Sequence, residues 1–414
     1  MIRNFTLLLL LAFCCYSPVA AASAMPPKSA SVTSVLQARL DSLLTDPMFE
    51  QTQLGLYIYD LTADSAIYKH NHRQLMRPAS NQKVVTAIAA LDYLGGNYHY
   101  ATSLYTHGCL CDSLLQGDIF LRGGLDPRLD STDVAAFAQA LFEKGVRRIE
   151  GNLFLDASLK DSLLYGWGWC WDDDNPKLSP LLYEGRPSLA DRMIDALTET
   201  GIDLCGMMCD SLLPDSAELL LTRSHSIDQI LMPMMKDSDN LYAESLFYQM
   251  GAKSGEAFPG RDQSIKPVHR LIKRVGLNPA DYRIADGSGL SLYNYVTPEL
   301  LGKILRYAYR NKRIYNHLLP SLPVAGEDGT LRKRMRKGYA HGKVFAKTGT
   351  VTGISTLSGY LTAPNGHRLC FSIMNQGLRR VATGRDFQDR LCEALLTPAD
   401  QPWPAQKKKK NSKR

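Results

Sequence analysis

Three short polar motifs, spread over most of the 414-residue chain, constrain the fold more than any other feature of the sequence. They are Ser80-Asn81-Gln82-Lys83, Ser238-Asp239-Asn240 and Lys347-Thr348-Gly349, and each pattern occurs once. A lone S-x-x-K arises roughly once or twice by chance in a chain of this length. Three reactive motifs in this order indicate a fold that brings one hydroxyl and two amines into a single pocket.

The first motif opens a predicted helix. Ser80 precedes the apolar stretch 84–94, so we expect it in the first turn of a mostly buried helix, with Lys83 on the same face. Lys83 can accept the hydroxyl proton only when neutral. That state requires burial and a like charge, which Lys347 can supply, to lower its pKa from ~10.4 to about 7, at about 4 kcal/mol. The alternative is a capping role for Ser80 and a surface position for Lys83.

The second motif directly precedes the helix-like run 241–246, so its side chains belong to a loop or a helix start. From there they can face the same pocket. Ser238 would relay a proton between Lys83 and the leaving group, and Asn240 would hold a substrate amide. Ordinary helix capping, which Ser, Asp and Asn all favour, is the alternative.

The third motif lies on a predicted strand. Gly349 has no side chain to present, and it permits close backbone approach instead. The backbone N–H groups of Ser80 and Thr350 would then form an oxyanion hole. Lys347, with the hydroxyls of Thr348 and Thr350, would capture a carboxylate.

The segment 286–291, Asp-Gly-Ser-Gly-Leu-Ser, competes for the nucleophile because it exposes serines among glycines. It does not fit G-x-S-x-G, and no predicted strand leads into it, so we interpret it as a turn or a cleft wall. The histidines show no metal-site spacing. We therefore predict neither a metal nor a cofactor.

Residues 1–24 have the three-part pattern of a secretory signal peptide, from Arg3 through an apolar stretch to Ala22-Ser23-Ala24. We expect export to the periplasm and release after about Ala24. Cys14 and Cys15 suggest a lipoprotein instead, but the bulky Phe13 disfavours that cleavage site.

The formal charge of +7 lies outside the body of the chain, on Arg3 and on six basic residues of the tail 401–414. A nearly neutral body argues against nucleic-acid binding. We predict that the tail is disordered and solvated, with contact to an anionic envelope surface as the alternative.

Seven cysteines follow the leader, an odd number for an oxidising compartment, so at least one has no partner within the chain. Their spacing fits no zinc site and no disulfide scaffold. We expect local disulfides or buried thiols among Cys109, Cys111, Cys170, Cys205, Cys209, Cys370 and Cys392.

Hydrophobic patterning predicts one antiparallel sheet built from two strands near the N-terminus and three near the C-terminus. These strands are 54–60, 66–70, 343–347, 356–362 and 368–375. Amphipathic helices at 31–44 and 385–396 would pack on the sheet. Between about Tyr100 and Thr222, short apolar runs broken by Gly, Asp and Pro indicate an inserted, largely β subdomain.

From about Gln53 to Cys392 the chain resembles the type-4 penicillin-binding proteins, a D-alanyl-D-alanine carboxypeptidase/endopeptidase family. The resemblance rests on the three motifs and on the segments 77–83, 121–127, 238–244, 286–291, 329–331 and 346–350. One departure is Leu292, where the family often has a basic residue.

The resemblance implies an α+β fold of the DD-peptidase/β-lactamase transpeptidase type, in which helices flank an antiparallel sheet and form a helical subdomain. The penicillin-binding DD-peptidase domain would comprise residues 25–100 and 223–400. The inserted subdomain would comprise residues 101–222.

The resemblance also implies a serine DD-peptidase that acts on peptidoglycan stem peptides through an acyl-enzyme on Ser80. Lys83 would be the general base, and Ser238 and Asn240 would serve as proton relay and substrate contact. Lys347, Thr348 and Thr350 would form the carboxylate and oxyanion side. Penicillins should acylate the same serine, because they mimic the D-Ala-D-Ala end.

Two other functions share some of these features. A class A β-lactamase needs a further Glu for deacylation, and no E-x-x-L-N segment lies between Ser80 and Lys347. An idle peptidoglycan-binding module would be expected to lose its nucleophile or base, and both are intact. Trimming terminal D-alanine and cutting cross-links use the same acyl-enzyme, so the prediction covers both activities.

Overall fold

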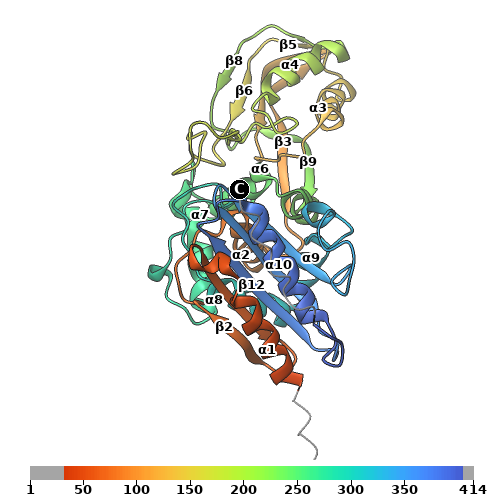
Figure 1. Ribbon diagram of the computed structural model, residues 1–414. Helices are drawn as coiled ribbons and strands as arrows, with labels where there is room; N and C mark the ends of the chain where they lie inside the picture. Colours follow the sequence, from red (N-terminus) through yellow and green to blue (C-terminus); the bar gives the residue numbers. More distant parts are fainter. Residues whose placement is uncertain (1–31, 404–414) are drawn as a thin grey trace, which may run out of the picture.

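The computed structural model describes residues 32–403, which form two β-sheets with helices packed on and between them (Figure 1). The predicted signal peptide and the tail from residue 404 lie outside the described residues. Within residues 32–403, no helix is long and apolar enough to cross a membrane.

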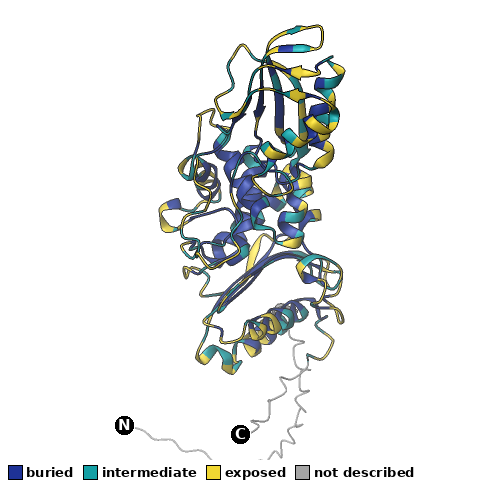
Figure 2. Cartoon of the chain, turned by 90° about the horizontal axis from the view of Figure 1, so that it is seen from above, coloured by how far each residue is buried: buried dark blue, intermediate teal, exposed yellow. Residues whose placement is uncertain are grey.

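The first sheet has five antiparallel strands in the order β10-β11-β12-β1-β2. They are β1 (Gln53–Asp60), β2 (Ser65–His70), β10 (Val344–Val351), β11 (Ile354–Thr362) and β12 (Arg368–Gln376). The prediction of one antiparallel sheet from both ends of the chain is therefore confirmed. In Figure 2 most of this sheet is coloured as buried, because both of its faces are covered.

Alternate side chains of the first sheet enter two different hydrophobic cores. On β1, Leu56 and Ile58 face the core shared with α1 (Val32–Leu44) and α10 (Val381–Leu396). Tyr57 and Tyr59 face the opposite core, which the helical layer fills. The two predicted covering helices thus exist, and α10 begins four residues before its predicted start at Arg385.

The helical layer surrounds α2 (Gln82–Tyr93), whose residues Gln82–Leu91 are all buried. Its other helices are α5 (Ile227–Met232), α6 (Asn240–Ala252), α7 (Arg261–Arg274), α8 (Pro298–Arg310) and α9 (Lys312–Ser321). Short helical turns are η1 (Pro47–Glu50), η2 (Ala79–Asn81), η3 (Pro233–Asp237), η4 (Pro279–Asp281) and η5 (Gly329–Leu331). A helix that is buried on every side needs this kind of central position.

The second sheet uses strands between His99 and Ser226, and it lies at one end of the molecule (Figure 1). Its main order is β7-β5-β4-β3-β9, and β6 pairs with β4 and β8. The strands are β3 (His99–Cys111), β4 (Leu114–Arg122), β5 (Arg148–Ile149), β6 (Leu153–Asp156), β7 (Asp203–Leu204), β8 (Met208–Asp210) and β9 (Glu218–Ser226).

Two helices that the sequence analysis did not predict cover this second sheet. They are α3 (Ser131–Glu143) and α4 (Leu189–Thr200), and Phe137 and Met193 belong to their shared core. The sheet has parallel as well as antiparallel pairs, because these helices connect neighbouring strands. The division of the chain at residues 101–222 stays a prediction.

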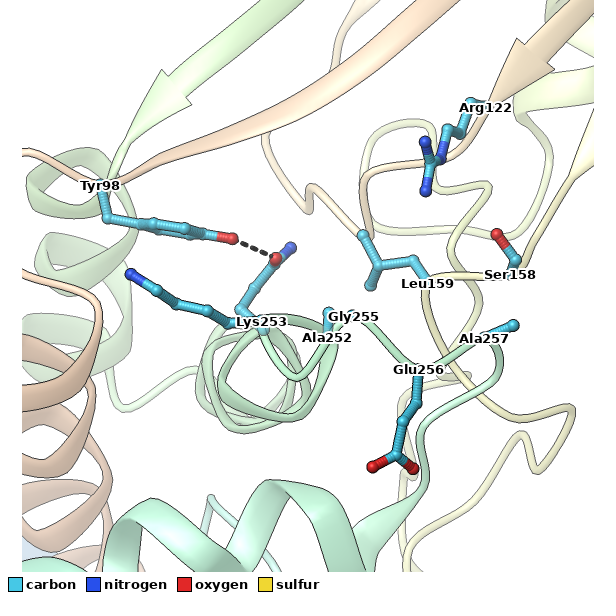
Figure 3. Close-up of a pocket in the computed structure, with 10 residues that line it drawn as sticks. Tyr98, Arg122, Ser158, Leu159, Ala252, Lys253, Gly255, Glu256 and Ala257 are labelled. Atoms are coloured by element: carbon cyan, nitrogen blue, oxygen red, sulfur yellow. Dashed lines mark hydrogen bonds between the residues drawn. The ribbon is translucent and has the colours of Figure 1, made fainter. Parts of the chain in front are cut away.

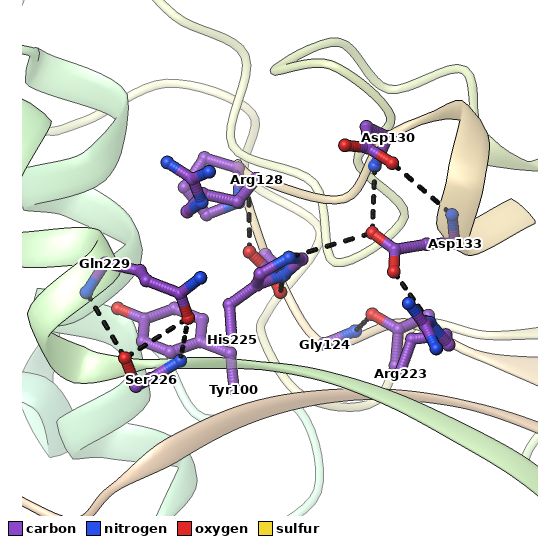
Figure 4. Close-up of polar contacts among 12 residues, drawn as sticks. Tyr100, Gly124, Arg128, Asp130, Asp133, Arg223, His225, Ser226 and Gln229 are labelled. Carbon is purple, nitrogen blue, oxygen red and sulfur yellow. Dashed lines mark hydrogen bonds and ion pairs between the residues drawn. The ribbon is translucent and has the colours of Figure 1, made fainter.

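A buried polar network lies where β9 meets the loop after β4 (Figure 4). Asp126 Oδ2 lies 2.7 Å from His225 Nδ1, and burial raises the pKa of Asp126. Asp133 accepts a hydrogen bond from Arg223 at 2.7 Å and caps α3 together with Asp130. Both buried carboxylates are therefore paired, as burial of charge requires.

A cavity of about 430 Å³ lies between the second sheet and the end of α6 (Figure 3). The Tyr98 hydroxyl donates to Gln249 at 2.7 Å on one wall, and Arg122 and Lys253 also line the cavity. None of the motif residues lines it. All seven cysteines within residues 32–403 are free thiols, and only Cys370 and Cys392 are fully buried.

Candidate active site

Ser80 lies in the 3-10 turn η2, which runs directly into α2, so the nucleophile candidate precedes the helix proper. Ala79 has a left-handed backbone (φ 47°), an uncommon conformation for alanine that turns the chain into the helix. Lys83 follows one turn later, and its Nζ lies 3.1 Å from Ser80 Oγ. The predicted pairing of these two side chains is present.

The turn that carries Ser80 is fastened to the first sheet. Asn81 Nδ2 donates to the Lys347 carbonyl at 3.0 Å, and the Thr356 hydroxyl donates to the Pro78 carbonyl at 2.8 Å. A Cβ on Gly349 would lie 2.8 Å from the Pro78 oxygen and 3.0 Å from the Asn81 nitrogen. The predicted close approach at Gly349 is therefore confirmed.

Lys83 is completely buried and has three oxygen partners. Besides Ser80 Oγ, its Nζ contacts Asn240 Oδ1 at 2.7 Å and the Ser288 carbonyl at 2.9 Å. Burial lowers the pKa of Lys83 to about 8, and the negative charges of Asp286 and Glu244 oppose that decrease. Near neutral pH a useful fraction of this amine is therefore unprotonated.

Lys347 occupies the other side of the same group of residues. Its Nζ donates to Ser238 Oγ at 2.8 Å and to the Thr348 carbonyl at 2.9 Å. Burial and the positive charge of Lys83 hold the pKa of Lys347 well below its usual range. The two buried ammonium groups disfavour each other's charged form, as expected for a like pair, while the nearby carboxylates of Asp286 and Glu244 favour the charged form of Lys83.

The three residues of the second motif have different roles at the start of α6. Asp239 is the helix N-cap and accepts from Tyr242 N at 3.2 Å. Ser238 takes a left-handed backbone (φ 66°) after η3, and Asn240 opens the helix. Helix capping thus belongs to Asp239, whereas Ser238 and Asn240 contact the two lysines.

The hydroxyls of Thr348 and Thr350 contact residues outside the three motifs. Thr348 Oγ1 lies 2.8 Å from Thr330 Oγ1, and Thr350 Oγ1 accepts from Arg385 Nη2 at 3.2 Å. Neither Thr330 nor Arg385 was predicted to have a role. Thr330 could have been recognised, because it lies in the segment 329–331 that resembles the family. No feature of the sequence pointed to Arg385.

The segment 286–291 forms a wall of the site, as the sequence analysis interpreted it. Ser288 is fully buried and offers its carbonyl, not its hydroxyl, to Lys83. Asp286 accepts from Trp169 Nε1 at 2.9 Å, from Asn294 Nδ2 at 2.7 Å and from backbone amides of its own loop. Trp169 reaches this wall from the segment between β6 and α4.

Glu244 is a second buried carboxylate behind the wall, and the sequence analysis assigned it no role. It accepts hydrogen bonds from the amides of Gly287 and Ser288. Its position on the apolar helix that follows Ser238-Asp239-Asn240 could have indicated a role. A buried charged residue is retained only where partners stabilise it.

Together these contacts place a hydroxyl beside a buried amine, and a second hydroxyl beside a second buried amine. Such a pair supports nucleophilic attack with proton transfer to the amine. Within residues 32–403, no group of three or more His, Cys, Asp or Glu side chains could hold a metal ion.

The family model for "D-Ala-D-Ala carboxypeptidase 3 (S13) family" matches residues 36–181 and 184–396. A D-alanyl-D-alanine carboxypeptidase of Actinomadura sp. (strain R39) is 28% identical over 454 residues, covering 86% of this chain and 84% of that protein. D-alanyl-D-alanine carboxypeptidase DacB of Haemophilus influenzae is 25% identical over 413 residues, covering 79% and 86%.

Solved structures show the same fold. Penicillin binding protein 4 from Haemophilus influenzae superposes with a TM-score of 0.77 at 22% identity, covering 86% of this chain and 99% of that chain. A predatory endopeptidase from Bdellovibrio bacteriovorus gives a TM-score of 0.56 at 17% identity, covering 84% and 94%. The α+β architecture expected from the sequence is therefore confirmed.

Proposed function

Because the chain belongs to the D-Ala-D-Ala carboxypeptidase 3 (S13) family, we propose that it hydrolyses D-alanyl-D-alanine bonds of peptidoglycan stem peptides through an acyl-enzyme on Ser80. It is an enzyme of the serine-type D-Ala-D-Ala carboxypeptidase class. The observation that carries the proposal is the 3.1 Å contact between Ser80 Oγ and the buried Lys83 Nζ.

In the first step, neutral Lys83 accepts the Ser80 proton while Oγ attacks the carbonyl carbon of the penultimate D-alanine. The C–N bond breaks, and the leaving amine takes a proton by way of Lys83 and Ser238. Water then attacks the ester and releases the shortened peptide. The pKa of about 8 for Lys83 suits this role, since the amine must both gain and return a proton.

The remaining motif residues bind and orient the substrate. Asn240 Oδ1 is occupied by Lys83, which leaves its amide N–H groups for a substrate carbonyl. The backbone N–H groups of Ser80 and Thr350 form the oxyanion hole. The substrate carboxylate binds between Lys347, Thr348 and Thr350.

The same acyl-enzyme serves both terminal trimming and cutting of D-alanine cross-links, because the two reactions differ only in the leaving amine. β-Lactam antibiotics are covalent inhibitors in this proposal, since their ring amide takes the place of the scissile bond. The Haemophilus influenzae protein has been solved in complex with a β-lactam.

We place the enzyme in the periplasm, where its polymer substrate lies, on the pattern of residues 1–24. We expect the tail, with its six basic residues after Pro404, to be solvated, and contact with the anionic envelope is the alternative. Removal of residues 404–414 should leave hydrolysis of a soluble pentapeptide unchanged, and weaker binding to isolated sacculi at low salt would favour the alternative.

The proposal is tested with residues 25–414, a fluorescent penicillin and a pentapeptide stem. We expect stable labelling that Ser80→Ala abolishes, together with release of D-alanine by the wild type. Rapid turnover of the penicillin would favour a β-lactamase, and absence of labelling would favour a binding module. Digestion of cross-linked muropeptides measures the endopeptidase activity separately.

A further inference from the structure

We propose that Glu244 is a positioning residue of this reaction, which acts on Lys83 through the backbone of Gly287 and Ser288. The inference rests on the proposed function of Ser80 and Lys83. Glu244 is a buried carboxylate outside the three motifs. It holds the general base in place and sets how readily Lys83 releases its proton.

The helix α6 approaches Lys83 with two residues one turn apart. Asn240 and Glu244 are spaced i,i+4 and so lie on the same face of the helix. Asn240 contacts Lys83 Nζ directly at 2.7 Å. Glu244, one turn deeper and 1% exposed, contacts the wall behind the lysine.

That wall is held from both sides along two successive residues. On one side, Glu244 accepts from Gly287 N at 3.1 Å and from Ser288 N at 2.7 Å. On the other side, α2 donates to both carbonyls: Thr86 Oγ1 to Gly287 O at 2.6 Å and Lys83 Nζ to Ser288 O at 2.9 Å. Ser288 N–H and Gly287 C=O belong to one planar peptide unit, which Glu244 and Thr86 hold from opposite sides. The Ser288 carbonyl that Lys83 contacts belongs to the next peptide unit, whose Gly289 N–H donates to Asp286. Glu244 therefore positions this carbonyl through the backbone of Ser288.

Charge adds a second effect to this geometry. Burial and the negative charge of Asp286 raise the pKa of Glu244 to about 8, although the hydrogen bonds from Gly287 and Ser288 oppose the increase. Ionised Glu244 in turn raises the pKa of Lys83. Loss of this charge should therefore make Lys83 easier to deprotonate, even though the amine is less well placed.

Other titratable groups surround this pair, and none of them is removed in the test. The negative charges of Asp239, at the start of α6, and of Asp286, in the wall, raise the pKa of Lys83. The positive charge of Lys83 lowers the pKa of Lys347 on β10. Lys160, from the segment after β6, and Tyr248 of α6 both interact with Glu244.

Three variants of the full mature chain separate position from charge. Glu244→Gln removes the charge and keeps the side-chain shape. Thr86→Val releases the opposite side of the same peptide without a change of charge. Asp133→Asn is the matched control, because Asp133 is also a buried carboxylate, paired with Arg223 in the network after β4.

The rate of acylation by a fluorescent penicillin is measured against pH, with thermal unfolding recorded for each variant. For Glu244→Gln we expect the plateau rate to fall about tenfold or more, as for a misplaced catalytic group. The acid limb should move to lower pH, by less than the loss of a fully ionised carboxylate would cause, because Glu244 itself titrates in the same range as Lys83. Thr86→Val should lower the plateau and leave the limb in place. Asp133→Asn should change neither.

The inference would be overturned if the pH profile of Glu244→Gln matched that of the wild type in both its acid limb and its plateau. It would also be overturned if Glu244→Gln lost thermal stability while the acid limb of its pH profile stayed in place. If Glu244→Gln fails to fold, Thr86→Val decides: a wild-type plateau rejects the positioning role. Failure of the proposed function looks different, because the wild type itself would then remain unlabelled.

Discussion

Lys347 Nζ donates a 2.8 Å hydrogen bond to Ser238 Oγ and so joins the edge strand of the five-stranded sheet to the start of helix α6. The two residues are 109 positions apart in the chain. Both lysines of the site are fully buried, and each contacts a different serine hydroxyl. The site is thus two amine and hydroxyl pairs placed side by side across the contact between sheet and helical layer.

The first prediction concerns the base. Lys83→Ala should reduce acylation of Ser80 by about 10²–10⁴-fold, the usual contribution of a positioned general base. The measurement is the rate of labelling by fluorescent penicillin. Lys253→Ala, which changes an exposed lysine at the end of α6, is the matched control and should label at the wild-type rate. Equal rates for the two variants would exclude Lys83 as the base.

The second prediction concerns pH. Because the pKa of Lys83 is lowered to about 8, the amine is mostly protonated below that pH and cannot accept the Ser80 proton. The acylation rate should therefore fall about tenfold per pH unit below about pH 8 and level off above it. Stopped-flow labelling of the wild type measures the profile. A rate independent of pH between about 6 and 8 would contradict the assignment.

The third prediction concerns the close approach at Gly349. Gly349→Ala would push a Cβ against the Pro78 carbonyl and the Asn81 amide, which flank Ser80. Overpacking of this kind costs about 1–3 kcal/mol and displaces backbone. We expect a lower midpoint of thermal unfolding and a reduced acylation rate. Wild-type values of the unfolding midpoint and of the acylation rate would show that β10 and the turn η2 can move apart without loss of stability or activity.

The fourth prediction concerns Arg385, whose guanidinium lies 3.2 Å from the Thr350 hydroxyl. If a substrate carboxylate binds at Thr350, Arg385→Ala should raise KM about tenfold, since a hydrogen bond to a charged group contributes about 1.5 kcal/mol, and kcat should change little. Arg379→Ala, at another exposed arginine, is the control. A C-terminally amidated peptide should show no difference between Arg385→Ala and the wild type.

Much of the fold followed from local patterning. The strands β1, β2, β11 and β12 lie within about two residues of their predicted bounds, because their side chains alternate between two cores and clear turns separate them. The strand β10 continues to Val351, four residues beyond its predicted end at Lys347. The helices α3 and α4 were missed, because the broken texture of residues 101–222 concealed their short amphipathic segments.

The sequence by itself determined which groups are available for reaction, since Ser80, Lys83, Ser238, Asn240 and Lys347 stand in motifs whose chemistry can be read from residue type and spacing. Only the tertiary structure decided their partners: Glu244 behind Lys83, Thr330 beside Thr348, and Arg385 beside Thr350. It also placed the carboxylates of Asp286 and Glu244 beside Lys83. Spacing along a chain fixes neighbours within one helix or strand, whereas burial and charge depend on segments that meet only after folding.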